Sequence, residues 1–283
     1  MKKTQNVLRS VLNSTSESTP DIPAKLDNRL IQATNQSEIL GYLSRFGWLT
    51  SRMVAELVWP NAAQSLTMAR RTLSALTEEK LVFTRPFSKG GAAYIISAKG
   101  AAMLRGDGID AKSGYSISIG NPIHRACSNW YLIRALSQGF TVVTEHEIAT
   151  GKGPCKVVNG KVADGLVIAD GGRCVWVECE HAQKSRAERH KVVGLAKEAF
   201  GHSKLIELGP GLHLVRLAIV GTNQHALRWM AKSFDDARQY GNLTEGQLAD
   251  IDACLLPISE SLVPGDALDG NLYYDILHPK DDE

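Results

Sequence analysis

Hydrophobic residues recur at the spacing of amphipathic helices in three successive segments of the N-terminal third of the chain. The pattern predicts helices over residues 37–47, 50–60 and 62–80, with Ser37 and Thr50 as N-caps. Residues 1–36, by contrast, are rich in Ser, Thr, Asn and Gln and show no regular hydrophobic spacing. This composition is typical of a flexible arm that becomes ordered late, or only on a partner.

The pattern then changes from helical to extended. Two short segments within residues 81–96 are joined by Lys89-Gly90-Gly91, which favours a hairpin, and Ser97 is placed to cap a further short helix. Three helices followed by a hairpin are the element order of a winged helix-turn-helix. Residues 37–105 are therefore predicted to form that domain, and the Gly- and Ser-rich residues 106–120 a linker.

The remaining pattern alternates between the two periods, which indicates an α/β domain of the sandwich type over residues 121–240. The predicted elements are, in order, a helix over 121–139, strands over 141–148, 164–168 and 174–179, a helix over 181–200, a strand over 212–220 and a helix over 225–240. The fold class is therefore α/β overall.

Charge divides the chain more sharply than its net value of +2 suggests. Residues 1–110 carry 14 basic against 9 acidic residues and residues 111–240 carry 17 against 11, whereas residues 241–283 carry 1 against 10. A basic body of this kind suits phosphate, although a solvated surface gives the same count. Residues 241–283 are predicted to be an acidic C-terminal tail that does not touch phosphate.

Neither targeting nor disulfide chemistry is indicated. The chain lacks both the roughly 20 consecutive apolar residues of a membrane span and the apolar core of a secretory signal, so a cytoplasmic location without membrane contact is expected. The five cysteines form no pair at the spacing of a zinc or disulfide motif, so they are expected to be reduced packing thiols.

In a winged helix the third helix enters the major groove of DNA and the hairpin tip lies on the phosphate backbone. The side chains expected to read the groove are Gln64, Ser65, Arg70 and Arg71, and those expected near phosphates are Arg85 and Lys89. The same domain can instead serve dimerisation or contact another protein, and the sequence leaves that alternative open.

Acidic residues gather where strands of the second domain begin or end. Asp164 begins one predicted strand, and the two-residue period puts Glu178 and Glu180 on the same face of the next. Like charges this close need a cation or a proton between them. A divalent metal ion held by Asp164 and Glu178 would meet that need; the alternative is that Glu180 caps the following helix and Glu178 pairs with an arginine.

The succession of Asp164, Glu178-x-Glu180 and a helix carrying Lys184 resembles the PD-(D/E)XK nuclease core, in which an acidic residue on one strand and an acidic-x-lysine on the next hold metal and attacking water. Together with the winged helix, Ala163-Asp164-Gly165-Leu166-Val167 and the helix bearing His124 and Asn129, it resembles the plasmid replication-relaxation proteins, including MOBC-type relaxases. The resemblance covers roughly residues 37–240.

This resemblance implies a DNA endonuclease that acts at a transfer origin with Mg²⁺ or Mn²⁺ held by Asp164 and Glu178. It implies double-stranded DNA as the main partner, with other relaxosome or coupling proteins beside it. The remaining candidates for accessory roles are His124, Asn129, Tyr131, Glu145 and Glu147, the last two on alternate positions of a predicted strand, where they can equally face solvent.

Two positions depart from the nuclease pattern. Ala163 stands where the pattern has proline, and Glu180 stands where it has lysine. Lys184 is the substitute candidate for the missing charge, with Glu180 as a second catalytic candidate. If Lys184 points away from the carboxylates, the domain is a DNA-binding platform without activity, such as a replication or transfer regulator. Tyrosine-based relaxase chemistry is disfavoured because none of the eight histidines forms a His-x-His motif.

Overall fold

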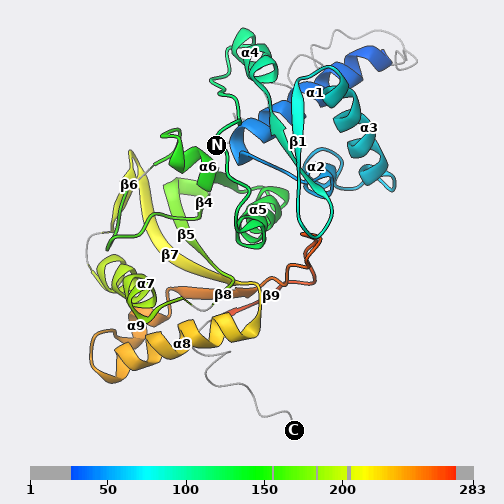
Figure 1. The fold of residues 1–283 in the computed structure, drawn as a ribbon. Coiled ribbons are helices and arrows are strands. Elements are labelled where there is room, and N and C mark those ends of the chain that lie inside the picture. Colours follow the sequence, from blue (N-terminus) through cyan, green and yellow to red (C-terminus); the bar gives the residue numbers. More distant parts are fainter. Residues whose placement is uncertain (1–26, 155, 183, 203–204, 272–283) are drawn as a thin grey trace, which may run out of the picture.

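The computed structural model describes residues 27–154, 156–182, 184–202 and 205–271, and shows a mixed α/β protein (Figure 1). A helical unit with a two-stranded hairpin lies beside a larger unit built on a seven-stranded sheet. No helix among the described residues is long and apolar enough to cross a membrane.

The N-terminal unit has the element order predicted for residues 37–105. Its elements are α1 (Asn28–Phe46), α2 (Ser51–Val58), α3 (Ser65–Glu78), the antiparallel pair β1 (Val82–Pro86) and β2 (Ala92–Ile96), and α4 (Ala98–Gly106). The hydroxyls of Thr50 and Ser97 cap α2 and α4 as expected, each accepting a hydrogen bond from a backbone N–H three residues later. Gly90 and Gly91 both have positive φ, which the turn between β1 and β2 requires.

The first helix corrects the predicted extent of the N-terminal arm. Helix α1 begins at Asn28, where the Asp27 carboxylate accepts a hydrogen bond from the Arg29 N–H, and not at Ser37. Its first turns are exposed, so hydrophobic periodicity gives no sign of them; they extend a helix whose later residues are anchored in the core. Residues 1–26 lie outside the described part of the chain. The predicted third helix is also shorter than 62–80, at Ser65–Glu78.

The larger unit supplies the sheet and the helices that cover it. Its helices are α5 (Pro122–Ser137), α6 (Glu145–Ala149), α7 (Arg186–Ala199), α8 (Gln224–Gln239) and α9 (Glu245–Leu248), with a 3₁₀ turn at Asp170–Gly172. Its strands are β3 (Thr141–Thr144), β4 (Gly165–Ile168), β5 (Arg173–Glu180), β6 (Glu207–Gly209), β7 (Leu212–Gly221), β8 (Ile251–Leu255) and β9 (Leu268–Asn271).

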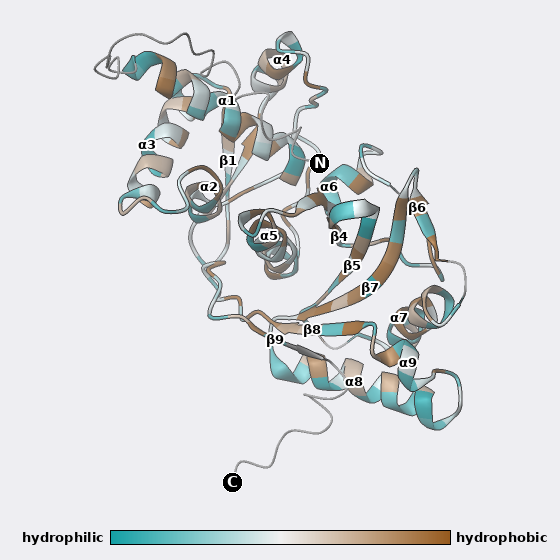
Figure 2. Ribbon diagram, turned by 180° about the vertical axis from the view of Figure 1, so that it is seen from behind, coloured by the Kyte–Doolittle hydropathy of each residue, from teal (hydrophilic) through white to brown (hydrophobic). Residues whose placement is uncertain are grey.

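The strand order is β3-β4-β5-β7-β8-β9, with β6 paired to β7. β5, β7 and β8 are parallel to one another, and the remaining pairs are antiparallel. Helix α5 covers one face, and α7 and α8 cover the other (Figure 1). The central strands β5 and β7 are hydrophobic over most of their length, as strands covered on both faces must be (Figure 2).

The prediction of an acidic tail over residues 241–283 is wrong for its described part. β8 lies against β7 inside the sheet, and Ile251 and Cys254 are buried. None of the acidic residues described in this segment is buried. The count of charges therefore gave no sign of a short strand that is buried only by pairing with a strand distant in the sequence. Residues 272–283 lie outside the described part of the chain.

The predicted linker is also packed rather than loose. The Arg85 guanidinium donates to the carbonyls of Tyr115 and Ile117, and the Tyr115 ring stacks on Phe83 with 4.7 Å between centroids.

The two units also contact each other directly. The Asn129 side-chain amide of α5 donates to the Trp48 carbonyl at 3.0 Å. One hydrophobic core runs from α1–α3 into α5 and the near face of the sheet, so the two units form a single packed body.

Candidate active site at the edge of the sheet

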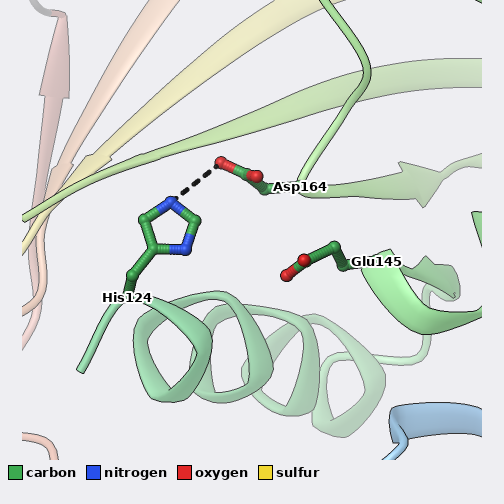
Figure 3. Close-up of side chains that lie close together, drawn as sticks. All are labelled: His124, Glu145 and Asp164. Atoms are coloured by element: carbon green, nitrogen blue, oxygen red, sulfur yellow. Dashed lines mark ion pairs between the residues drawn. The ribbon is translucent and has the colours of Figure 1, made fainter. Parts of the chain in front are cut away.

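One edge of the sheet gathers the ends of three neighbouring strands. Because β3 and β5 run opposite to β4, the end of β3, the start of β4 and the end of β5 meet there, with Thr144 opposite Gly165 and Gly165 opposite Val177. Helix α5 begins at the same edge and brings His124 to it (Figure 3). Pairing of the backbones places these element ends side by side, so their polar side chains lie close together.

Asp164 is at the centre of this group. Its Oδ2 accepts a hydrogen bond from the Cys179 N–H at 2.8 Å and lies 3.4 Å from His124 Nε2, while Ser128 Oγ donates to its backbone carbonyl at 2.7 Å. Burial alone would raise the pKa of Asp164, but the His124 ring and the Cys179 N–H stabilise the carboxylate and hold the pKa below its usual value. Asp164 is therefore the ionised carboxylate of the site.

His124, Glu145 and Asp164 form a group able to hold a metal ion. One ligand atom of each lies within 4.8 Å of the others, and Figure 3 shows the three side chains converging from α5, α6 and the start of β4. Arg125 Nε lies 2.9 Å from Glu145 Oε2. Burial raises the pKa of Glu145, and the pKa of His124 is raised because Asp164 outweighs the opposing effect of burial.

Glu178 and Glu180 are buried beside two lysines. Lys184 Nζ lies 3.0 Å from Glu178 Oε1 and 2.8 Å from Glu180 Oε1, and Lys161 Nζ also contacts Glu178 Oε1. The second oxygen of Glu178, Oε2, has no hydrogen-bond partner among the described residues. Both carboxylates therefore share one face of β5 with the ammonium groups, as the two-residue period predicted for the pair.

Burial dominates the protonation of these two carboxylates. It raises the pKa of Glu180 to about 7 despite the attraction of Lys184, and burial together with Asp164 raises the pKa of Glu178. The two carboxylates in turn raise the pKa of Lys184, against the effect of its own burial. Near neutral pH Asp164 is therefore ionised, whereas Glu180, whose pKa is about 7, is only partly ionised.

Lys184 lies beside the carboxylates, as expected from the sequence, but it is not on the predicted helix. It precedes α7, whose N-cap is Ser185, and so it reaches the carboxylates from a loop and not from a helix. Glu180 therefore does not cap the helix, and the partners of Glu178 are lysines and not an arginine.

The two upstream glutamates sit on a helix and not on a strand. Thr144 begins α6 with a capping box in which its N–H donates to Glu147 Oε2 at 2.9 Å, and the second oxygen of Glu147 pairs with Arg45 at 2.7 Å. Glu147 therefore stabilises a helix end and the contact with α1. Glu145, in the same first turn, is the one that faces Asp164 (Figure 3).

Two other accessory candidates lie away from the carboxylates. Asn129 is buried and bonded to Trp48, so it joins the two units. Tyr131 faces the C-terminal strands, where burial and the charges of Cys254 and Asp269 raise its pKa. On α5, His124 and Ser128 reach Asp164, but Tyr131 does not.

The residues predicted to contact DNA are partly exposed and partly engaged. Gln64, Arg70 and Arg71 are exposed on or beside α3, and Ser65 is half-buried at its start. Arg85 is occupied by the carbonyls of Tyr115 and Ile117, so its role is structural in this conformation. Lys89 is exposed at the hairpin turn, with its Nζ 3.5 Å from Glu260.

Sequence reasoning missed three polar residues of the edge. Lys161 belongs to a tight turn in which Val158 and Lys161 form an isolated bridge, and no spacing rule points to it. His181 directly follows Glu180, and its Nδ1 lies 2.8 Å from Thr222 Oγ1. Arg125 follows His124 on α5 and pairs with Glu145. For His181 and Arg125, the sequence signal was that each directly follows a predicted site residue.

In comparisons with known proteins, no protein-family model, curated protein or solved structure matches the chain.

Proposed function

We propose that this protein binds duplex DNA through residues 37–105, acting as a winged helix-turn-helix, and cleaves a DNA strand with a divalent metal ion at the edge of the sheet. The assignment as a relaxase that acts at a plasmid transfer origin with relaxosome or coupling proteins rests on the motif resemblance. The edge of the sheet provides the chemical support for cleavage, and the exposed α3 provides the support for DNA binding.

The observation that carries the proposal is the convergence of Asp164, Glu178 and Lys184. The nuclease pattern requires an acidic residue from one strand, a second from the next, and an ammonium group beside them. Here the ammonium of Lys184 lies 3.0 Å from Glu178 although Glu180 occupies the usual lysine position. Lys161 supplies a second ammonium to the same oxygen. Lys184 and Lys161 thus place ammonium groups beside Glu178, as the nuclease pattern requires, although neither is at the usual lysine position.

The donor set fits a divalent cation and favours Mn²⁺. His124, Glu145 and Asp164 offer one nitrogen and two carboxylate donors, and imidazole is a better ligand for Mn²⁺ than for Mg²⁺, which prefers oxygen alone. Glu178 adds a buried carboxylate oxygen without a hydrogen-bond partner in the described structure. A bound ion would lower the pKa of a coordinated water and offset charge on the scissile phosphate. Lys184 and Lys161 would stabilise the phosphate from the other side.

The DNA-binding part of the proposal draws on α3. Arg70 and Arg71 are exposed on consecutive positions of this helix, and Gln64 is exposed just before it. Arginine and glutamine are the side chains that most often bond to guanine and adenine edges in the major groove. Lys89 and the exposed Gly90 and Gly91 would contact the backbone from the hairpin, as a wing does.

The test is nicking of supercoiled plasmid that carries the DNA flanking the gene for this protein, with Mn²⁺, Mg²⁺ or a chelator. We expect nicking only with metal, and a decrease of about 100-fold or more for Asp164→Asn and Glu178→Gln, which remove charge but keep shape. Asp170→Asn is the matched control, because Asp170 is an exposed carboxylate in the turn between β4 and β5. DNA affinity should be unchanged in all three variants.

Two lysine variants refine the same assay. Lys161→Met and Lys184→Met should each lower the rate, and the double variant should abolish nicking, because either ammonium can face the phosphate. Wild-type nicking by both Asp164→Asn and Glu178→Gln would disprove the metal mechanism.

A non-catalytic DNA-binding regulator is the second candidate. It is favoured by the two ion pairs at Glu178, which balance its charge without any metal. Under this alternative, Arg70→Ala/Arg71→Ala abolishes DNA binding while no metal produces nicking in the wild type.

A further inference from the structure

Helices α7 and α8 carry a band of cations on the face of the sheet opposite α5. They pack against each other, and the band, here called the α7–α8 basic surface, consists of positions in the first half of α7 and between His225 and Lys232 of α8. Its cations are Arg186, Arg189, Arg228 and Lys232, and the ring side chains of His190, His225 and Trp229 lie among them.

Contacts at Arg189 join the two helices within this surface. The Arg189 guanidinium lies over the Trp229 ring at 5.1 Å and donates to Ser233 Oγ at 3.0 Å, so it bridges α7 and α8. Trp229 Nε1 in turn donates to His225 Nε2 at 2.6 Å. The surface therefore has a fixed aromatic centre at the seam, flanked by the cations of both helices.

The cations of this surface lack acidic partners. Within the described structure Arg186, Arg228 and Lys232 form no ion pair, and Arg189 bonds to a carbonyl and a hydroxyl. Glu188 is engaged with Lys191 at 2.6 Å and Asp235 with Arg238 at 3.0 Å, and Asp236, one turn beyond Lys232, is an exposed carboxylate beside the surface. The four Arg and Lys side chains still give the surface an excess of positive charge, which suits an external anion.

The surface is joined directly to the carboxylate site. Arg189 donates to the carbonyl of Lys184, the residue whose ammonium holds Glu178 and Glu180. Asn223, the N-cap of α8, donates from Nδ2 to the His181 carbonyl at 3.1 Å. Both helices begin at this edge, so their positive ends add to the field of the side chains.

We propose that the α7–α8 basic surface holds the phosphate backbone of the DNA strand where that strand leaves the site, a contact separate from that of α3. This inference rests on the proposed function, because the strand is the one that the site would cut. The surface lies across the sheet from α5 (Figure 1), so duplex bound by α1–α3 does not cover it. Unpaired cations with an aromatic ring among them suit a single strand, whose phosphates and bases are both accessible.

The experiment uses full-length protein carrying Asp164→Asn, so that the DNA stays intact. Affinity for a labelled single strand of mixed sequence, and for a duplex of the same sequence, is measured over a series of salt concentrations. Arg228→Ala/Lys232→Ala should weaken single-strand binding about tenfold at moderate salt and lower the slope of log affinity against log salt by about 1.4, because about 0.7 is lost per phosphate contact. Duplex affinity should change less.

Arg173→Ala/Lys197→Ala is the matched control, since it removes the same charge from exposed residues at the start of β5 and the end of α7. It should leave the slope unchanged. Arg228 and Lys232 are exposed, so their variants should melt as the parent does; should the double variant fail to fold, Arg228→Gln alone provides the same test with half the change in slope.

An unchanged slope in the α8 variant, or an equal change in the control, would overturn the inference. If Arg70→Ala/Arg71→Ala weakens duplex binding while the α8 variant has no effect, the DNA-binding function stands and this surface has another partner, such as an acidic protein. If the wild type never nicks DNA but the slope falls as expected, the endonuclease is disproved and the strand contact remains.

Discussion

Asp164 owes its ionised state first to His124 and then to a hydrogen bond that the strand order provides. The Cys179 N–H points at its Oδ2 because β4 and β5 are antiparallel neighbours, and His124 reaches the same oxygen from α5. Among the described residues no backbone N–H donates to the carboxylate of Glu178 or Glu180, and burial leaves both with raised pKa values. Three carboxylates in one space therefore differ in protonation, as an acid–base site requires.

Glu180 should make the protein less stable as pH rises toward neutrality. Its pKa is about 7 in the folded protein against 4.5 unfolded, so the stabilisation that it provides is complete below pH 4.5 and is lost as pH rises to about 7. Relative to Glu180→Gln, the wild type should lose on the order of 2–3 kcal/mol of unfolding free energy over this range. Urea denaturation of both proteins at a series of pH values measures the difference, and parallel stability curves would contradict it.

At the scale of residues, the sequence located the carboxylates and one lysine but not their full environment. Asp164, Glu178 and Glu180 are predictable because strand alternation and strand ends fix their places. Lys161 is not predictable, because it comes from a turn whose position depends on the sheet. Nor does the sequence show that Glu145 faces the site while Glu147 does not. That difference arises because residues predicted to end a strand form α6, where Glu147 belongs to the capping box.

At the scale of elements, Asn129 is a buried polar connection between the two units. Its amide donates to the Trp48 carbonyl in a buried setting, so Asn129→Ala leaves that carbonyl without its partner. Unfolding free energy should fall by about 1–3 kcal/mol. We expect DNA affinity to be retained below the melting transition, because α3 is not touched.

Thermal and urea unfolding of Asn129→Ala test this, with Gln138→Ala, at the exposed end of α5, as the control. Stability equal to wild type would show that the bond does not couple the units.

The elements themselves were predictable to the extent that their periodicity is local. Helices α2, α3, α5 and α8 follow their hydrophobic stripes closely. β8 was missed because its five residues lie among acidic positions and are buried only by pairing with β7, which comes some 30 residues earlier. The exposed start of α1 was missed because it has no hydrophobic face to reveal it.

At the scale of the whole molecule, the two units share one core, and the site lies where the β3–α6 junction contacts α1. Arg45 of α1 bonds to the Val142 carbonyl, and Thr144 bonds back to the Arg45 carbonyl, immediately before Glu145. The helical unit, whose α3 is proposed to read DNA, and the candidate metal ligands therefore keep a fixed relation. Such rigidity suits an enzyme that must place one phosphate at one set of carboxylates.

Binding of Mn²⁺ to the full-length protein, measured by titration calorimetry without DNA, tests the metal site most directly. A single ion should bind near neutral pH, and its affinity should fall at least about tenfold for Asp164→Asn and for His124→Ala, because each removes a ligand atom. Asp170→Asn should bind as the wild type does. Undiminished Mn²⁺ binding by both Asp164→Asn and His124→Ala, or no binding by the wild type, would contradict a metal centre at this edge.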